Sequence, residues 1–133
     1  MHNHPSVEEL ILSVKNFIDE TAAPNLEGHA AFHARVASNA LATVLRDIAA
    51  RPKNETDETG RLQTLLGSIE TDLDDLNREL SSRIHSGTFS INTPGLLDHL
   101  KVTAIAQVEV DQPRYSGLKT AKEKRLHDKD EAF

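Results

Sequence analysis

The chain has 133 residues and a formal net charge of −6 at neutral pH, and its length fits a single domain. It has no cysteine, which excludes disulfides and thiolate metal sites, and its acidic balance with only 4% aromatic residues argues against nucleic-acid binding. No apolar run approaches the roughly 20 residues of a membrane span, and the N-terminus lacks a signal-peptide pattern, so we expect a cytoplasmic protein without a membrane partner.

The first helix is predicted to begin at a capping box formed by Ser6 and Glu9, and Pro24 is expected to end it. A second, alanine-rich helix follows over about residues 27–50. The first helix carries one apolar stripe at helical spacing, made of Val7, Leu10, Ile11, Val14, Phe17 and Ile18.

The polar segment 51–60 is predicted to be a loop, because it is acidic and contains Pro52 and Gly60. A third helix is expected over about residues 61–85, ended by Gly87. Its apolar residues follow a 4-3-4-3-4 spacing typical of a coiled-coil-like seam, namely Leu62, Leu66, Ile69, Leu73, Leu76 and Leu80.

The fourth helix is expected to begin with Thr93 as its cap and Pro94 at its first position. The segment 110–118 breaks it, and residues 119–133 form a charged tail, which is expected to be either a frayed helix or disordered. Its apolar stripe is expected to contain Leu96, Leu97, Leu100, Ala104 and Val108. These elements predict an all-α protein: a mostly antiparallel four-helix bundle over residues 1–118, with an irregular C-terminal segment and the tail 119–133.

Two histidines of the second helix, His29 and His33, are predicted to lie within its apolar arc, one turn apart. A pair of histidines four residues apart can bind zinc, and Glu27 or His99 would add ligands, but the sequence lacks the glutamate of an H-E-x-x-H motif. Another interpretation is a polar pocket for a small anion or acyl group. The simplest is that both rings pack and donate to backbone carbonyls. We therefore expect no metal and no cofactor.

Arg35 and Asn39 border the same arc, and the loop containing Arg114 and Tyr115 is a candidate to close the pocket. In this hypothesis Arg35 anchors the loop through its planar guanidinium group. The candidate ligand-binding residues are thus His29, His33, Arg35, Asn39, Arg114 and Tyr115.

Two carboxylate pairs of the third helix, Glu70 with Asp74 and Asp75 with Glu79, also have the spacing of metal ligands. Di-iron bundles combine such glutamates with a Glu-x-x-His motif, which this sequence lacks. We therefore interpret these acids as a solvated face of the helix. No catalytic residue is proposed from the sequence.

Three segments, "LEGHAAFHARVASNAL", "LNRELSSRIHSG" and "VDQPRYSG", resemble the bacterial family called domain of unknown function 6285. The resemblance covers roughly residues 5–118. It implies a small helical protein encoded beside, or fused to, an aminoglycoside-phosphotransferase-like kinase, commonly near acyl-CoA dehydrogenase genes. It implies no catalytic residues, and the kinase's own H-x-D-x-x-x-x-N loop does not occur here.

The function expected from these observations is a non-catalytic accessory or interaction module that works with a phosphotransferase-like partner in acyl or small-molecule metabolism. The alternative is a small-molecule or anion-binding bundle with its pocket at His29, His33, Arg35 and Asn39; an enzyme is the third alternative. We also expect a homodimer that buries the second or third helix, because the apolar surface of these helices exceeds what a four-helix monomer hides.

Overall fold

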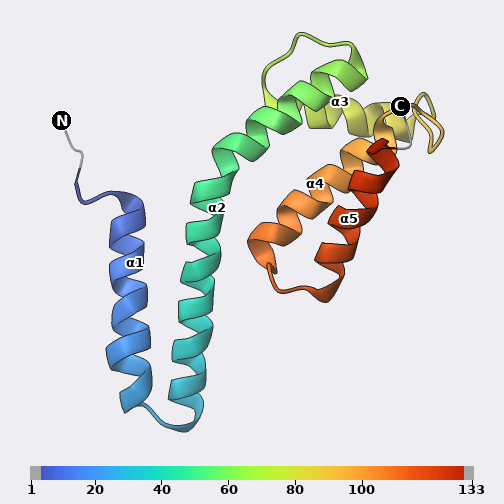
Figure 1. Cartoon of the computed structure of the whole chain (residues 1–133). Helices are drawn as coiled ribbons and strands as arrows, with labels where there is room; N and C mark the ends of the chain where they lie inside the picture. The colour runs from blue at the N-terminus through green and yellow to red at the C-terminus, as the bar shows by residue number, and fades with distance from the viewer. Residues whose placement is uncertain (1–3, 131–133) are drawn as a thin grey trace. The chain divides into compact units, whose positions relative to one another are not determined.

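The computed structural model describes residues 4–130, with side chains through residue 124 (Figure 1). Every regular element in this part of the chain is helical, which confirms the prediction of an all-α protein. The chain divides into two compact units, an N-terminal unit of residues 1–51 and a C-terminal unit of residues 52–133. The elements are α1 (Val7–Phe17), the π-helix η1 (Ile18–Ala22), the 3-10 helix η2 (Ala23–Asn25), α2 (Gly28–Leu66), α3 (Leu73–His85), α4 (Leu96–Asp111) and α5 (Ser116–Asp130).

The start of α1 confirms the predicted capping box. The Glu9 amide donates to Ser6 Oγ at 3.2 Å, and the Ser6 amide donates to the Glu9 carboxylate at 2.6 Å. These bonds satisfy two amides that the helix cannot pair internally. The backbone bond from Ser6 also lowers the pKa of Glu9, because it favours the charged carboxylate.

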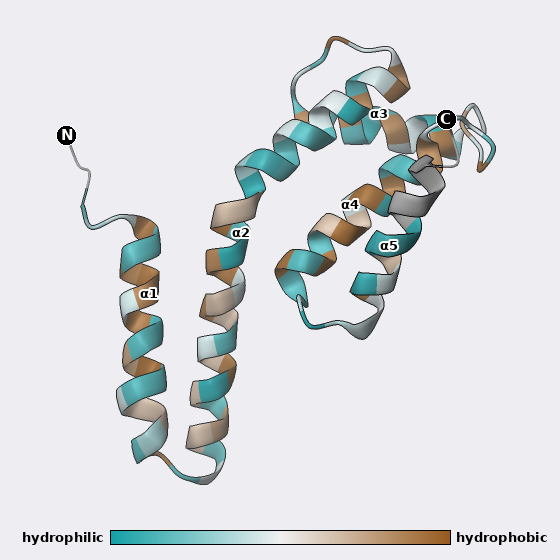
Figure 2. Cartoon of the chain, in the orientation of Figure 1, coloured by the Kyte–Doolittle hydropathy of each residue, from teal (hydrophilic) through white to brown (hydrophobic). Residues whose placement is uncertain are grey.

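The N-terminal unit is a hairpin of α1 and the first half of α2, joined through η1 and η2. The residues of α2 that are buried in this unit are small, Ala31 and Ser38. Asp19 of η1 bonds to Lys15 and to Ser38, and both hydrogen bonds lower the pKa of its carboxyl group. Figure 2 shows that apolar residues recur along the whole of α1, yet none of them is buried.

The segment 51–60 is helical, so the predicted loop there is wrong. Helix α2 continues through Pro52, which removes one backbone donor at the boundary between the two units. Ion pairs one turn apart support the helix on both sides of this proline: Arg51 with Asp47, and Lys53 with Asp57. The polar composition that suggested a loop belongs to a solvated stretch of helix.

The predicted helix over residues 61–85 is also wrong as one element, because the chain reverses at Gly67. This glycine has φ 64°, a left-handed conformation that side chains disfavour. The Ser68 amide donates to the Gln63 carbonyl oxygen at 3.1 Å, the bond expected of a Schellman motif that ends a helix. Ile69 lies in the reversal and is 96% exposed, so it does not belong to the leucine seam.

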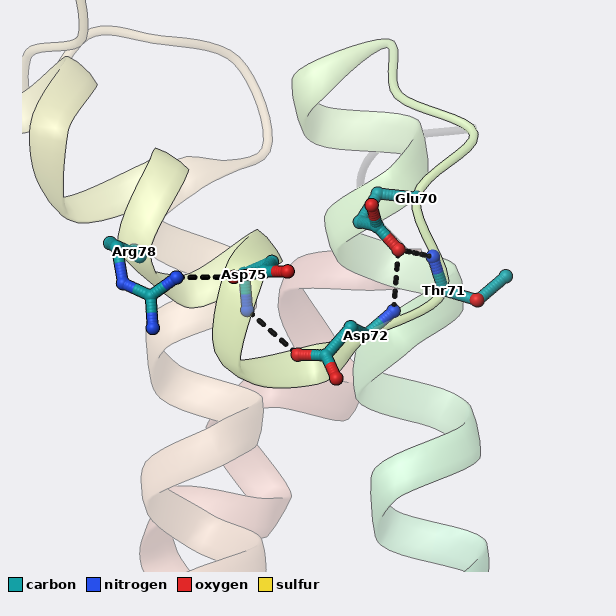
Figure 3. A network of polar contacts seen from close by, with 5 residues as sticks. All are labelled: Glu70, Thr71, Asp72, Asp75 and Arg78. Atoms are coloured by element: carbon teal, nitrogen blue, oxygen red, sulfur yellow. Dashed lines mark hydrogen bonds and ion pairs between the residues drawn. The ribbon is translucent and has the colours of Figure 1, made fainter.

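The acidic residues after Gly67 organise the start of α3 (Figure 3). The Glu70 carboxylate accepts from the amides of Thr71 at 2.7 Å and Asp72 at 2.9 Å, and these bonds lower the pKa of Glu70. Asp72 is the N-cap of α3, because its carboxylate accepts from the Asp75 amide at 3.0 Å. Asp75 in turn pairs with Arg78.

The core of the C-terminal unit is a leucine cluster that this reversal creates. Leucines of α2 and of α3, which the sequence placed along one continuous seam, meet as facing sides of a hairpin, and α4 adds one more. Leu62 and Leu76 have no exposed surface at all. The cluster, called the leucine core below, contains Leu62, Leu66, Leu76, Leu80 and Leu96, with Leu65, Leu73 and Phe89 packed against it.

The N-cap of helix α4 is Gly95 and not Thr93, which corrects the predicted cap. Gly95 has φ 83°, whereas the Thr93 hydroxyl accepts from the Ser90 amide in the preceding turn. The buried residues of α4 are Leu96, His99 and Val110. The predicted apolar stripe is therefore not the buried side of α4, because Leu97 and Leu100 are both 43% exposed.

The predicted break after α4 is confirmed at residues 112–115, which are not helical, and the residues that follow form helix α5, which packs on α4. Leu118 and Val110 are buried, and Lys122 pairs with Glu109 of α4. Helix α5 runs across residue 118, where a boundary with the tail 119–133 was predicted; residues 131–133 of that tail lie outside the described residues. None of the helices within residues 4–130 is long and apolar enough to cross a membrane.

We predict opposite effects for two glycine substitutions in α2 and its C-terminal reversal. Gly67→Ala should lower the free energy of unfolding by about 1–2 kcal/mol, because alanine disfavours the left-handed conformation. Gly60→Ala should raise it by about 0.5–1 kcal/mol, since a Cβ there lies in open space inside a helix. Urea denaturation measures both values. A neutral or stabilising Gly67→Ala would contradict the assigned reversal.

Candidate functional site

His29 and His33 are exposed, which corrects the prediction that they lie on the buried face of their helix. At about 100° per residue they lie opposite Ala31 and Ser38, the residues buried in the N-terminal unit. The two imidazole rings are stacked, with centroids 6.5 Å apart, and His33 meets the ring of Phe32 edge-on at 5.6 Å. The physical reason is that the buried side of α2 in this unit carries small residues, one of which, Ser38, bonds to Asp19 of η1, so the larger apolar arc stays outside.

Arg35 and Asn39 are exposed as well. Arg35 Nε donates to the Ala31 carbonyl oxygen at 3.3 Å, within its own helix. Arg114 and Tyr115 lie in the turn before α5, in the C-terminal unit, and Tyr115 is 57% exposed. The tyrosine ring covers Gly117, where an added Cβ would lie 2.7 Å from it. The pocket that was expected to join these residues to His29 and His33 remains a prediction.

The hairpin exposes most of its large apolar side chains. Among the described residues of the N-terminal unit, only Ala31 and Ser38 are buried. Phe17 is 59% exposed and Phe32 is 58% exposed. The set, called the hairpin apolar residues below, is Val7, Leu10, Leu12, Val14, Phe17, Phe32, Val36 and Val44.

A second candidate site lies in the C-terminal unit, around Arg61 of α2 and His99 of α4. Both residues line a cavity of about 600 Å³, whose other walls include Leu65, Pro94 and Gly95. Arg61 also lines a smaller cavity of about 360 Å³, where its Nη2 donates to the Thr103 hydroxyl at 3.3 Å. The cavity is large enough for a small organic ligand.

Two buried polar atoms of this site have no hydrogen-bond partner within the described residues, Nε of Arg61 and Nδ1 of His99. His99 is only 4% exposed. Burial lowers the pKa of His99, the charge of Arg61 lowers it further, and Glu58 and Asp98 act in the opposite direction. The imidazole is therefore neutral at neutral pH, with one donor and one acceptor nitrogen.

In the sequence, His99 was recognised only as a possible extra metal ligand, and no pattern pointed to Arg61. A spacing signal was available: Leu96, His99, Thr103, Ala106 and Val110 recur at helical spacing, and all of them are buried or half-buried. Leu97 and Leu100 belong to a second, more hydrophobic stripe on the same helix. The neighbouring residues in the sequence do not indicate which of the two stripes is buried.

The carboxylate pairs of the predicted third helix are engaged locally. Glu70 caps backbone amides, Asp75 pairs with Arg78, and Glu79 pairs with Arg83. Glu70 also lies before the start of α3, so it does not share a helix with Asp74. Within the described residues, no group of three or more histidine, aspartate or glutamate side chains is placed to hold a metal ion.

We predict that His99 makes stability depend on pH. Its pKa is lower in the folded state than in the unfolded chain, so the unfolded chain binds more protons and stability falls as pH drops below about 6.5. His99→Gln should flatten the dependence of the unfolding free energy between about pH 7.5 and 5, a range that brackets the ordinary histidine pKa. Denaturant titrations at several pH values measure this slope. The exposed control His33→Gln should keep the wild-type slope, and an unchanged slope in His99→Gln would contradict the assignment.

Comparison with known proteins identifies the family but no function. No curated protein and no solved structure matches the chain. A family model described as "Domain of unknown function (DUF6285)" matches residues 24–115, which include all of α2, α3 and α4, and both Arg61 and His99. Since this match covers more than half of the sequence, the chain belongs to the DUF6285 family.

Proposed function

We propose that the chain is a non-catalytic interaction module whose interacting element is the α1–α2 hairpin of the N-terminal unit. The observation that carries this proposal is the exposure of the hairpin apolar residues: α1 has no buried residue. A large number of apolar side chains left in water is typical of surfaces that bind another protein.

The hairpin has few means to stabilise itself. Domains of about 60 residues are already marginal, and those below about 40 residues usually need disulfides, metals or oligomerisation, so a unit of residues 1–51 lies in the marginal range. The chain has no cysteine, and the buried residues among those described in this unit are one alanine and one serine. An assembly that covers Phe17 and Phe32 would supply the missing core.

We further propose that the hairpins of two copies pair to form a homodimer. Two hairpins provide four helices, and a mostly antiparallel four-helix bundle then arises between chains. A twofold interface uses the same residues from both copies, so it needs no second sequence. The charge of the N-terminal unit permits such a homodimer. This unit has six acidic and four basic residues, a net charge of −2, so two copies repel only weakly.

The proposed partner of this dimer is an aminoglycoside-phosphotransferase-like kinase acting in acyl or small-molecule metabolism in the cytoplasm. The support for the kinase is the family resemblance of the three sequence segments. In this role the chain contributes binding and the kinase contributes phosphoryl transfer.

We predict that the chain sediments as a dimer, at twice 14.7 kDa, at tens of micromolar concentration. The double substitution Phe17→Ser, Phe32→Ser should weaken dimerisation at least about tenfold, because buried aromatic side chains dominate interface energies. Sedimentation velocity at several concentrations measures this change.

Tyr115→Ser is the matched control, since Tyr115 is as exposed as the two phenylalanines but belongs to the C-terminal unit. It should leave the dimer intact. A wild-type chain that stays monomeric, or a double variant that dimerises as well as the wild type, would reject the hairpin as the interface.

For the kinase we predict a binary complex. Co-expression of the tagged chain with the kinase encoded beside it should yield one peak in size-exclusion chromatography, and phosphotransferase activity should remain with the kinase. Failure of the two purified proteins to bind in calorimetry would remove the kinase from the proposal and leave the dimer untouched.

A further inference from the structure

The cavity around Arg61 and His99 has the features of a binding site, and it is separate from the hairpin apolar residues. All its lining residues lie in the C-terminal unit, on α2, on α4 and in the turn before α4. Its hydroxyl and apolar walls come from Thr56, Thr64 and Leu65. A role for this cavity therefore does not depend on dimerisation.

Arg61 and His99 present incomplete hydrogen bonding at this cavity. Arg61 Nε can only donate, so it requires an oxygen or another acceptor. His99, at 4% exposure, has an unpartnered Nδ1. Buried polar atoms in proteins are nearly always paired, so these two unpaired atoms mark a missing partner. Both atoms are covered by neighbouring groups, so a ligand in the cavity reaches them only after the side chains rearrange.

The charges around the cavity restrict the kind of ligand that the cavity can bind. Arg61 is a permanent cation, and the N-terminus of α4 at Gly95 contributes the positive end of a helix dipole. Asp57 and Asp98 also line the cavity, and Asp57 is paired with Lys53. These two carboxylates disfavour a dianion such as phosphate, while a single negative charge at Arg61 remains favourable.

The apolar wall of the cavity further restricts the chemistry of the ligand. Leu65 and Pro94 offer no hydrogen-bond donors to a ligand, so the part of the ligand that contacts them should be aliphatic. A carboxylate matches the planar guanidinium group of Arg61 better than a spherical anion does.

We propose that the cavity between α2 and α4 binds a small organic monocarboxylate with a short aliphatic chain. Its carboxylate accepts a hydrogen bond from Arg61 Nε, His99 Nδ1 makes a second polar contact, and the aliphatic chain lies against Leu65 and Pro94. Since both side chains are packed, a small rearrangement of the Arg61 and His99 rotamers accompanies binding.

The test follows the Arg61 Nε–Hε resonance of the full-length chain by ¹H–¹⁵N NMR, assigned through bonds in the wild-type protein. The probes are sodium butyrate, sodium phosphate and sodium chloride at equal ionic strength. Butyrate should shift the Arg61 resonance saturably, and chloride should not. A shift with phosphate alone would overturn the carboxylate class, and equal responses to butyrate and chloride, or no saturable response, would overturn the site.

Two variants show whether the response belongs to this cavity. Arg61→Lys should weaken butyrate binding at least about tenfold, followed through the amides of Gly95 and Asp98, because lysine keeps the charge but loses the planar fork. Arg78→Lys, on an exposed arginine of α3, is the matched control and should bind like the wild type. If Arg61→Lys does not fold, as judged by circular dichroism, the wild-type titration alone decides. Unchanged binding in a folded Arg61→Lys would contradict the proposal.

Discussion

The reversal of the chain at Gly67 is the constraint on which the C-terminal unit depends. By ending α2 in a left-handed residue, it turns one run of leucines into two facing sides of a hairpin. The leucine core that results fixes the last turns of α2 against α3 and the start of α4. The cavity lies at the edge of this core, so Arg61 and His99 are held by packing that other residues provide.

The two units offset the conformational entropy that is lost on folding in different ways. The C-terminal unit has a buried apolar core, supported by local devices such as the Asp72 cap and the pairing of Asn77 with Glu58 between α2 and α3. The N-terminal unit has a good helix start at Ser6, but among its described residues no apolar side chain larger than alanine is fully buried. Its helices are well specified locally, and their apolar faces still require a surface to cover them.

The all-α class, the capping box and the break near Pro24 could be predicted because each depends on neighbouring residues. The leucines of the core were also identified, but their arrangement was not, since a single left-handed glycine outweighed a regular spacing of 4-3-4-3-4. His29 and His33 were placed on the wrong face because the buried side of α2 in this unit is the one with Ala31 and Ser38 and not the more hydrophobic one. The site at His99 depends on residues about 40 positions apart in the sequence, which periodicity alone does not connect.

Hydrogen exchange of the intact chain at two concentrations tests most directly whether the hairpin is covered in an assembly while the C-terminal unit is stable by itself. On dilution from tens of micromolar to nanomolar concentration, amides of α1 and of residues 28–51 should exchange faster, because the assembly dissociates by mass action. Amides of residues 62–80, around the leucine core, should keep their rates. Hairpin amides that do not respond to dilution, or an equal response in both units, would contradict the division of roles between them.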